Sequence, residues 1–171
     1  MSALQCVQKA RNNLATYLNN ERTHIANRSV NDAGAISLLD RTYALIRVMQ
    51  FVQVITEDEA NELIDSGFME FVQSGTKVKL PENPIQQIVD WDLTTTPEKT
   101  IQLWWRARLN AHSAKLLAEY EKITDNIQKM EIINILFAES EAGGILGVST
   151  RTERLRNDIS LNKKLQELTG G

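Results

Sequence analysis

The chain has 171 residues, enough for one domain with its own hydrophobic core. Its net charge of −3 argues against a protein that coats nucleic acid through bulk charge. Its single cysteine, Cys6, excludes an intrachain disulfide, and we expect a cytoplasmic protein. The most apolar window, Tyr43 to Ile55, is too short to cross a bilayer, so no membrane contact is expected.

Four short patterns predict the N-termini of helices. In each, a serine or threonine is followed three residues later by glutamate or glutamine, and a periodic apolar run begins there. The two side chains can satisfy backbone N–H groups that lack a partner in the first turn. The four pairs are Ser2 with Gln5, Thr56 with Glu59, Thr95 with Glu98, and Thr150 with Glu153.

The first two helices are expected to form a hairpin. The first runs from about Ala3 to Ile25, with apolar residues spaced by three, four and seven along one face. The polar segment NRSVNDAG interrupts the pattern, and a second helix runs from about Asp32 to Val54. Two long helices joined by a short polar loop pack antiparallel.

The middle of the chain gives mixed signals. A short helix that starts at Thr56 should end at Gly67, because glycine readily adopts a left-handed C-cap conformation. Apolar and lysine residues alternate after a Ser-Gly pair, which predicts a small β-hairpin near residues 69–80. The alternative is that residues 68–73 continue the helix. A short helical stretch, IQQIVDWDL, is expected after the prolines that follow.

The C-terminal half is predicted to be helical throughout. No residue breaks the pattern from Pro97 to Gly143, which allows one helix of roughly 45 residues, far longer than usual. The alternative is that Thr124 and Asp125 cap a second helix and split this segment in two. A last capped helix follows Thr150. Three of its apolar residues are roughly aligned along one face: Leu155, Ile159 and Leu165.

These elements predict a mainly α fold. It consists of a helical hairpin and a long C-terminal helix in a bundle, with a small β-hairpin near residues 69–80. Residues 1–93 would form the hairpin and the middle element, and residues 94–171 the long helix and the last one. We expect the two parts to behave as one cooperative domain.

An apolar stripe on the long helix is the candidate protein interface. Its steps of three and four residues are close to those of a heptad seam. One interpretation is a core stripe inside an intramolecular bundle, and the other is a coiled coil between copies of the chain. The stripe residues are Leu116, Tyr120, Ile123, Ile127, Met130, Ile133 and Phe137.

The segment QLWWRARLNAHSAKL, residues 102–116, combines aromatic and basic side chains. Trp105 and Leu109 extend the apolar stripe and should be buried. Trp104 lies about 100° away around the helix. Arg108, four residues later, should stack on Trp104 as a cation–π pair. The pattern favours a structural role, with binding of phosphate or a partner as the alternative.

Charge alternates in blocks along the chain. Residues 1–30, 101–118 and 142–171 are basic, and the two segments between them are acidic. The basic blocks could meet on one face that contacts phosphate groups. The candidate nucleic-acid residues are Arg11, Arg22, Arg28, Arg106, Arg108 and Lys115.

The sequence shows no marker of a catalytic, metal or cofactor site. The glycine-rich stretch AGGILGVST lacks the lysine of a phosphate-binding loop. His24 follows Glu21 in the one Glu-x-x-His match, whereas a two-metal bundle needs two such pairs. Cys6 lies on an apolar flank and is expected to be a buried, inert thiol. We therefore expect no cofactor and no small-molecule substrate.

The function predicted from these patterns is that of a non-catalytic interaction or assembly protein. Its helical surfaces would bind a protein partner or a second copy of the chain. The first alternative is a small nucleic-acid-associated accessory protein with a basic face. The second is an enzyme whose site the sequence does not mark, which would require polar side chains from different segments to meet in a pocket.

Overall fold

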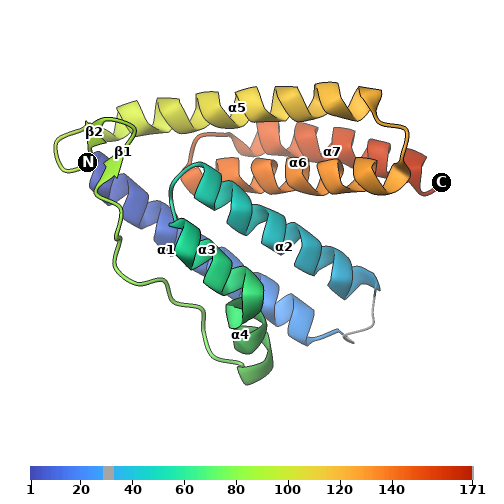
Figure 1. The fold of residues 1–171 in the computed structure, drawn as a ribbon, viewed down its shortest axis with the longest axis horizontal. Helices are drawn as coiled ribbons and strands as arrows, with labels where there is room; N and C mark the ends of the chain where they lie inside the picture. The colour runs from blue at the N-terminus through green and yellow to red at the C-terminus, as the bar shows by residue number, and fades with distance from the viewer. Residues whose placement is uncertain (29–32, 171) are drawn as a thin grey trace.

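The computed structural model describes residues 1–28 and 33–170 and confirms the mainly α fold. The helices pack into a single bundle, with α5 and α6 along one side and α1 and α2 along the other (Figure 1). In chain order, the elements are α1 (Ala3–Ala26), α2 (Ala33–Phe51), α3 (Glu57–Glu62), η1 (Leu63–Gly67), α4 (Phe68–Ser74), β1 (Gln87–Ile88), β2 (Trp91–Asp92), α5 (Glu98–Lys122), α6 (Asn126–Leu146) and α7 (Arg151–Leu168).

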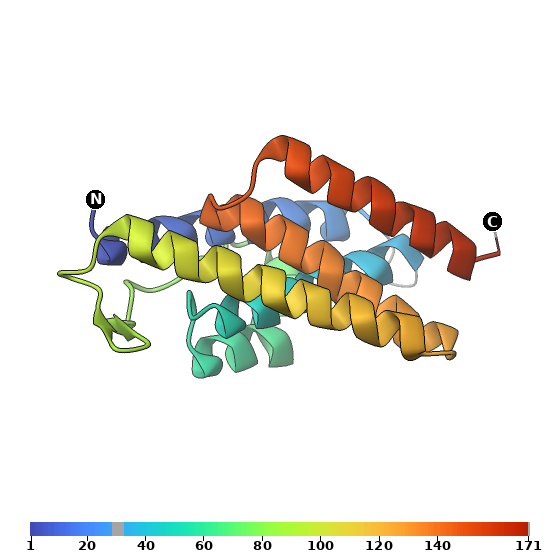
Figure 2. The ribbon, with the colours of Figure 1, turned by 90° about the horizontal axis from the view of Figure 1, so that it is seen from above.

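Helix α6 is the centre of the bundle. It packs against α1, α2, α5 and α7, and Figure 2 shows it lying between α5 and α7. Its residues are mainly apolar or small, and most from Ile132 onward are buried. A helix that is apolar on most of its sides is typical of a buried position. Helix α6 is therefore the element against which both α5 and α7 pack.

The main hydrophobic core crosses the expected division at residue 93. It includes Leu14 of α1, Ile46 of α2, Trp105 of α5 and Ala142 of α6. A smaller cluster lies where α5, α6 and α7 meet. That the two parts of the chain unfold together stays a prediction.

The N-terminus of α1 is confirmed as predicted. Ser2 Oγ accepts a hydrogen bond from the Gln5 N–H, and the Gln5 side chain accepts one from the Ser2 N–H. The amides of Ala3 and Leu4 donate at 2.8 and 2.9 Å to carbonyl groups in residues 93–96. A distant segment thus satisfies first-turn amides that no helix can satisfy internally.

Helix α2 packs antiparallel to α1, as expected, but it ends at Phe51 rather than at Val54. Its expected start at Asp32 lies outside the described residues. The Arg108 side chain donates to the Phe51 carbonyl at 2.8 Å, and Trp105 Nε1 donates to the Val52 carbonyl at 3.0 Å. Because α5 supplies these donors, the C-terminal carbonyls of α2 need no further helical turn.

Gly67 does not end the helix that Thr56 begins. Thr56 and Glu59 form the predicted capping box. The chain then passes through η1, a π-helical turn in which the Phe68 N–H donates to the Leu63 carbonyl. A Cβ atom on Gly67 would lie 2.9 Å from a backbone oxygen, so glycine permits this turn.

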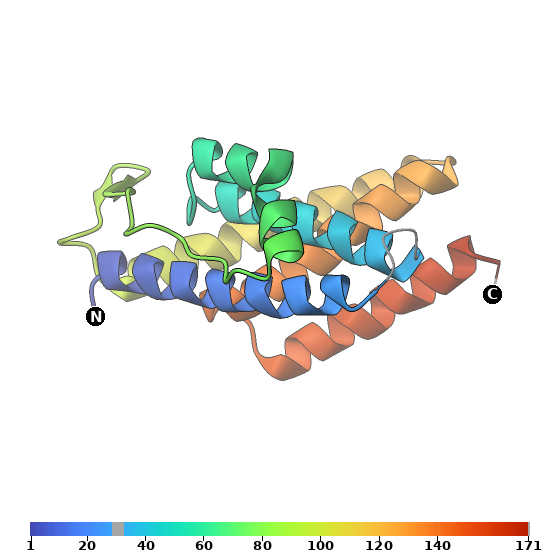
Figure 3. The ribbon, with the colours of Figure 1, turned by 90° about the horizontal axis from the view of Figure 1, so that it is seen from below.

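The β-hairpin predicted near residues 69–80 is wrong, and the helical alternative for residues 68–73 is confirmed. Helix α4 continues to Ser74 and ends at Gly75, whose φ of +72° forms a left-handed cap. The chain then runs extended along α1 (Figure 3). Asn19 of α1 accepts from the Val78 N–H at 2.6 Å and donates to its carbonyl at 3.1 Å. A side chain thus takes the place of a partner strand.

The helix predicted for IQQIVDWDL is also wrong. Strands β1 and β2 pair antiparallel there as a two-stranded sheet. Val89 in the turn has a φ of +57°, and the Asp92 side chain accepts from the N–H and the hydroxyl of Thr94. These local hydrogen bonds compete with helix formation.

The uninterrupted helix from Pro97 is wrong, and the split at Thr124 and Asp125 is confirmed. Helices α5 and α6 pack side by side, and Asp125 caps α6 by accepting from the Ile127 N–H at 2.9 Å. The chain folds back at this cap, which places the two halves of the segment antiparallel (Figure 2).

The two remaining caps have different outcomes. Thr95 does not cap α5, because the Glu98 N–H donates to the Met1 carbonyl instead. Thr150 does cap α7 by accepting from the Glu153 N–H. Of the three residues predicted to align on α7, Leu155 and Ile159 are 58% and 62% exposed, whereas Leu165 is half-buried.

Candidate functional site

The predicted apolar stripe does not form a continuous seam, because the chain reverses within it. Leu116 and Tyr120 of α5 are buried against Ile133 and Phe137 of α6 in the smaller cluster. The interpretation as a core stripe within the chain therefore holds for these four residues. A coiled coil between copies along this line is wrong, since the line is split between two helices.

The rest of the stripe lies near the turn between α5 and α6. Ile123 is half-buried, Met130 is exposed, and Ile127 is 70% exposed. Isolated exposed apolar residues are common on protein surfaces. These three residues alone are too few to define an interface, and their role as interface candidates stays a prediction.

The candidate nucleic-acid residues do not share one face, and Arg11 is not on the surface at all. Arg11 is fully buried and forms a bidentate ion pair with Glu59, with distances of 2.7 and 2.8 Å. It also donates to the carbonyl groups of Val54 and Pro81. The prediction that Arg11 contacts phosphate is therefore wrong, because this residue joins α1 to the middle of the chain.

Arg106 and Arg108 project from different sides of α5, as residues two apart on a helix must. Arg106 donates to the Val148 carbonyl at 2.8 Å and pairs with Glu153 at 3.4 Å. The guanidinium of Arg108 lies 3.9 Å from the centre of the Phe51 ring and 5.1 Å from that of Trp104. The predicted stacking of Arg108 on Trp104 is confirmed.

Trp105 and Leu109 are buried, also as predicted. Of the other basic candidates, Lys115 and Arg28 are exposed, and Arg22 is half-buried. The contacts of these residues support a structural role for the segment from residue 102 to residue 116. Its aromatic rings belong to the core and to a stacked flank rather than to an open binding surface.

A buried carboxylate joins α5 to α6. Glu139 is 4% exposed, and its two oxygens contact His112 Nδ1 and the Ser113 hydroxyl, which donates to it. Burial raises the pKa of Glu139 above its usual range, although the hydrogen bonds from Ser113 and His112 act in the opposite direction. The His112 ring also packs on Phe51, with centroids 4.7 Å apart.

An apolar groove lies on the side of this pair that His112 faces. It has a volume of about 420 Å³ and runs between α2, η1, α5 and α6. Most of its lining is aliphatic or aromatic. The lining residues are Tyr43, Ala44, Arg47, Val48, Phe51, Ile64, His112 and Ile135. Side chains far apart in the sequence thus form one apolar surface.

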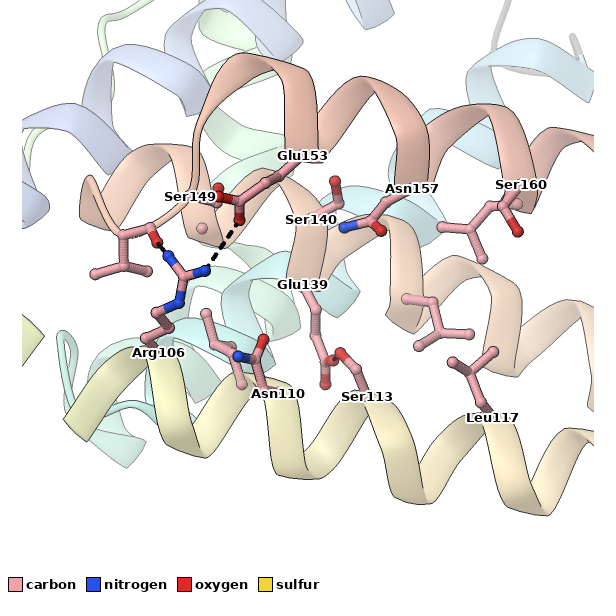
Figure 4. A pocket seen from close by; sticks show the side chains of 15 residues that line it. Arg106, Asn110, Ser113, Leu117, Glu139, Ser140, Ser149, Glu153, Asn157 and Ser160 are labelled. Atoms are coloured by element: carbon pink, nitrogen blue, oxygen red, sulfur yellow. Dashed lines mark hydrogen bonds and ion pairs between the residues drawn. The ribbon is translucent and has the colours of Figure 1, made fainter. Parts of the chain in front are cut away.

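A second cavity, of about 150 Å³, lies on the side of the pair that Glu139 faces. It fills the space between α5 and α7 above α6, and Figure 4 shows polar side chains from all three helices turned into it. The Arg106–Glu153 pair closes one end. Leucines from the three helices line the other end: Leu117, Leu136 and Leu161.

No pattern in the sequence predicted either cavity, and the acidic pair Glu139 and Glu141 was assigned no role. Glu139 pairs with residues 26 and 27 positions away, so no local motif marks it. One signal was present. Glu139 lies in the segment from Ile132 to Ile145, which is mostly apolar or small but also holds Asn134 and Glu141, and polar side chains in such a segment need partners if they are buried.

The structure also bears on the cysteine, the metal site and the membrane span that the sequence analysis considered. Cys6 is buried, as expected, and burial raises the pKa of its thiol. Within residues 1–28 and 33–170, no three His, Cys, Asp or Glu side chains come together as metal ligands would. None of the helices in the described part of the chain has the length and apolar character needed to span a bilayer.

Comparison of the chain with protein-family models, with curated protein sequences and with solved structures gives no match.

Proposed function

We propose that the protein is a non-catalytic interaction protein that binds an amphipathic helix of a partner in its apolar groove. The observation that carries this proposal is the groove between α2, η1, α5 and α6, which is lined almost wholly by apolar side chains and open to solvent. A concave apolar surface of this kind is the usual receptor for the apolar face of a helix.

The charge of the groove favours an acidic partner. Its lining includes the basic residues Arg47 and His112 and no aspartate or glutamate. Arg47 is exposed, and Arg108 lies beside the groove on the Phe51 ring. A helix with leucine or phenylalanine on one face and glutamate or aspartate along its flanks would match both the apolar floor and this rim.

A second copy of the chain is the less favoured occupant. One of the exposed apolar pairs on the described helices, Leu155 and Ile159, lies on α7. These residues are flanked by Arg151 and Arg156, which would meet the basic rim of the groove. Like charges brought together at an interface oppose binding, so we propose a different, acidic protein.

The buried carboxylate supports a structural rather than a catalytic role for His112. Ser113 donates its hydroxyl to Glu139 and not to the imidazole, so it is not positioned as a nucleophile that His112 activates. We propose that Glu139 orients His112 in the wall of the groove.

We further propose that the interaction takes place in the cytoplasm, since a chain with one buried thiol needs no oxidising compartment.

The test is a titration with two designed peptides, followed by backbone amide NMR. One peptide is an amphipathic helix of leucine and glutamate, and the other has lysine in place of every glutamate. We expect the acidic peptide to shift the amide signals of α2 and η1 saturably, and the basic peptide to bind at least tenfold more weakly.

Two variants, in each of which an alanine is replaced by glutamate, locate the site. Ala44→Glu places a carboxylate on the groove wall and should abolish binding of the acidic peptide. Ala107→Glu makes the same change at an exposed position of α5 that lies outside the groove, and it should leave binding unchanged. Equal binding of both peptides, or binding that survives Ala44→Glu, would overturn the proposal. If light scattering shows that the natural protein is a dimer and that Ala44→Glu is a monomer, the groove would be assigned to a second copy of the chain.

A further inference from the structure

We propose that the cavity between α5, α6 and α7 binds an uncharged, hydroxyl-bearing small molecule such as a short polyol or a pentose-sized sugar. This site lies on the opposite side of the His112–Glu139 pair from the apolar groove, and it is independent of the partner proposed above. Its volume of about 150 Å³ is room for about five water molecules.

The charged groups around the cavity are already neutralised by the protein. Arg106 pairs with Glu153 at 3.4 Å and donates to a backbone carbonyl at 2.8 Å. Both oxygens of Glu139 are engaged by His112 and Ser113. A charged ligand would therefore find no unmatched charge of the opposite sign and would lose its hydration on entry.

The groups that remain are neutral, and each can both donate and accept a hydrogen bond. The buried hydroxyls of Ser140 and Ser149 have no hydrogen-bond partner among the described residues. Ser140 is 8% exposed, and Figure 4 shows it near Asn157 of α7, with Asn110 of α5 across the cavity. A buried hydroxyl without a partner destabilises a fold by about 1–3 kcal/mol, so such groups are normally matched.

A hydroxylated ligand matches this arrangement in two ways. Its hydroxyl groups have the same dual donor and acceptor character as serine and asparagine side chains. Its C–H surface can lie against the leucines at the far end, Leu117, Leu136 and Leu161. A fully apolar ligand would leave the serine hydroxyls without hydrogen-bond partners. A charged ligand would lose its hydration against the leucine side chains.

Ser149 packs closely against Gly143 of α6. A Cβ atom on Gly143 would lie 2.5 Å from Ser149 Oγ, so glycine at this position leaves room for the hydroxyl. Ser149 lies in the connection between α6 and α7. The position of that connection therefore depends on a residue without a side chain.

The experiment is a titration with D-ribose, xylitol and glycerol, followed by the amide NMR signals of Ser140, Ser149 and Asn157. We expect saturable shifts for at least one of the three compounds, with one molecule bound per chain. Ribose 5-phosphate, which adds a charge to the same sugar, should bind at least tenfold more weakly. Isothermal titration calorimetry at the same concentrations provides the stoichiometry.

Three variants make the test specific. Ser140→Ala should weaken binding by about threefold to tenfold, the effect of one neutral hydrogen bond. Asn157→Leu, at an exposed position of α7, should abolish binding while the fold remains intact. Ser66→Ala changes an exposed serine of η1 far from the cavity residues and should have no effect.

Three results would each overturn the proposal. The first is the absence of any saturable shift with the three compounds. The second is a shift that rises linearly with concentration and is equal in Ser140→Ala and Ser66→Ala, because polyols act in this way as general co-solvents. The third is binding of ribose 5-phosphate as tight as that of ribose.

Discussion

The imidazole of His112 and the carboxylate of Glu139 form a direct contact across the α5–α6 interface, and this pair separates two cavities of opposite character. His112 lines the apolar groove, whereas Glu139 lines the polar cavity. The two partners of one contact thus belong to the walls of two different cavities.

Replacement of Glu139 by glutamine should change how stability depends on pH. Burial raises the pKa of Glu139 in the folded state. The stability that protonated Glu139 contributes is therefore fully present below the unfolded-state pKa of about 4.3. This stability is lost as pH rises through the folded-state pKa. We expect the free energy of unfolding of the natural protein to fall relative to that of Glu139→Gln across this window, as measured by urea denaturation.

The control for this measurement is Glu70→Gln, which changes an exposed carboxylate of α4. Its stability should follow that of the natural protein at every pH. If the curve of Glu139→Gln also ran parallel to that of the natural protein, Glu139 would not be the buried acid that the structure describes.

Removal of the buried Arg11 guanidinium should be among the most damaging single changes. Arg11→Met removes the guanidinium that donates to Glu59 and to two backbone carbonyls. Breaking one side of a buried ion pair destabilises a protein by about 3–5 kcal/mol. Urea denaturation should show a loss of this size. Lys9→Met, at an exposed position of the same helix, should change stability by about 0.5 kcal/mol or less.

The same variant has a pH signature. Burial alone would raise the pKa of Glu59, but hydrogen bonds from Arg11 and Thr56 hold it below its usual range. The stabilisation is therefore present above the unfolded-state pKa and lost as pH falls through the folded-state pKa. We expect the deficit of Arg11→Met to shrink in that acidic window, and a deficit that did not vary with pH would contradict the assignment.

Asn19→Ala should release the extended segment from α1. Asn19 is both donor and acceptor for Val78, so its removal leaves two backbone groups without partners. We expect a loss of about 1–3 kcal/mol and faster hydrogen exchange at the Val78 amide. Asn20→Ala, one position along α1 and exposed, should leave that exchange rate unchanged.

Gly67→Ala tests the π-helical turn. The added methyl group would lie 2.9 Å from the Glu62 carbonyl oxygen, and a backbone atom cannot move aside cheaply. Overpacking of this kind destabilises a protein by about 1–3 kcal/mol. Thermal unfolding should show the loss. Alanine at the adjacent exposed Ser66 should be neutral or slightly stabilising, because alanine favours helix.

The parts of the fold that follow from neighbouring residues could be predicted from the sequence. The box formed by Ser2 and Gln5 and the cap by Asp125 act within one turn, so their patterns are visible locally. Thr95 shows the limit of this approach. Its pattern is as good as that of Ser2, but a carbonyl of the N-terminal segment takes the amide that Thr95 would have capped.

The functional candidates depended on contacts that no local pattern contains. The apolar stripe from Leu116 to Phe137 has a regular spacing, but its partner is its own second half after the chain reverses. Arg11 resembles any basic residue on a helix until Glu59 is placed beside it. The polar cavity unites residues 106–161, so its members become a group only once α7 lies across α6.

The attachment of the N-terminal residues to residues 93–98 sets an order for folding during synthesis. The amides of Ala3 and Leu4 find their carbonyl acceptors only after that segment has left the ribosome, although α1 itself is made first. Arg11 likewise cannot form its hydrogen bonds until Glu59 and the Pro81 carbonyl have been translated. Helix α1 is therefore translated before the segments that hold it in place, and a nascent chain that stops before residue 93 lacks the carbonyl groups to which Ala3 and Leu4 donate.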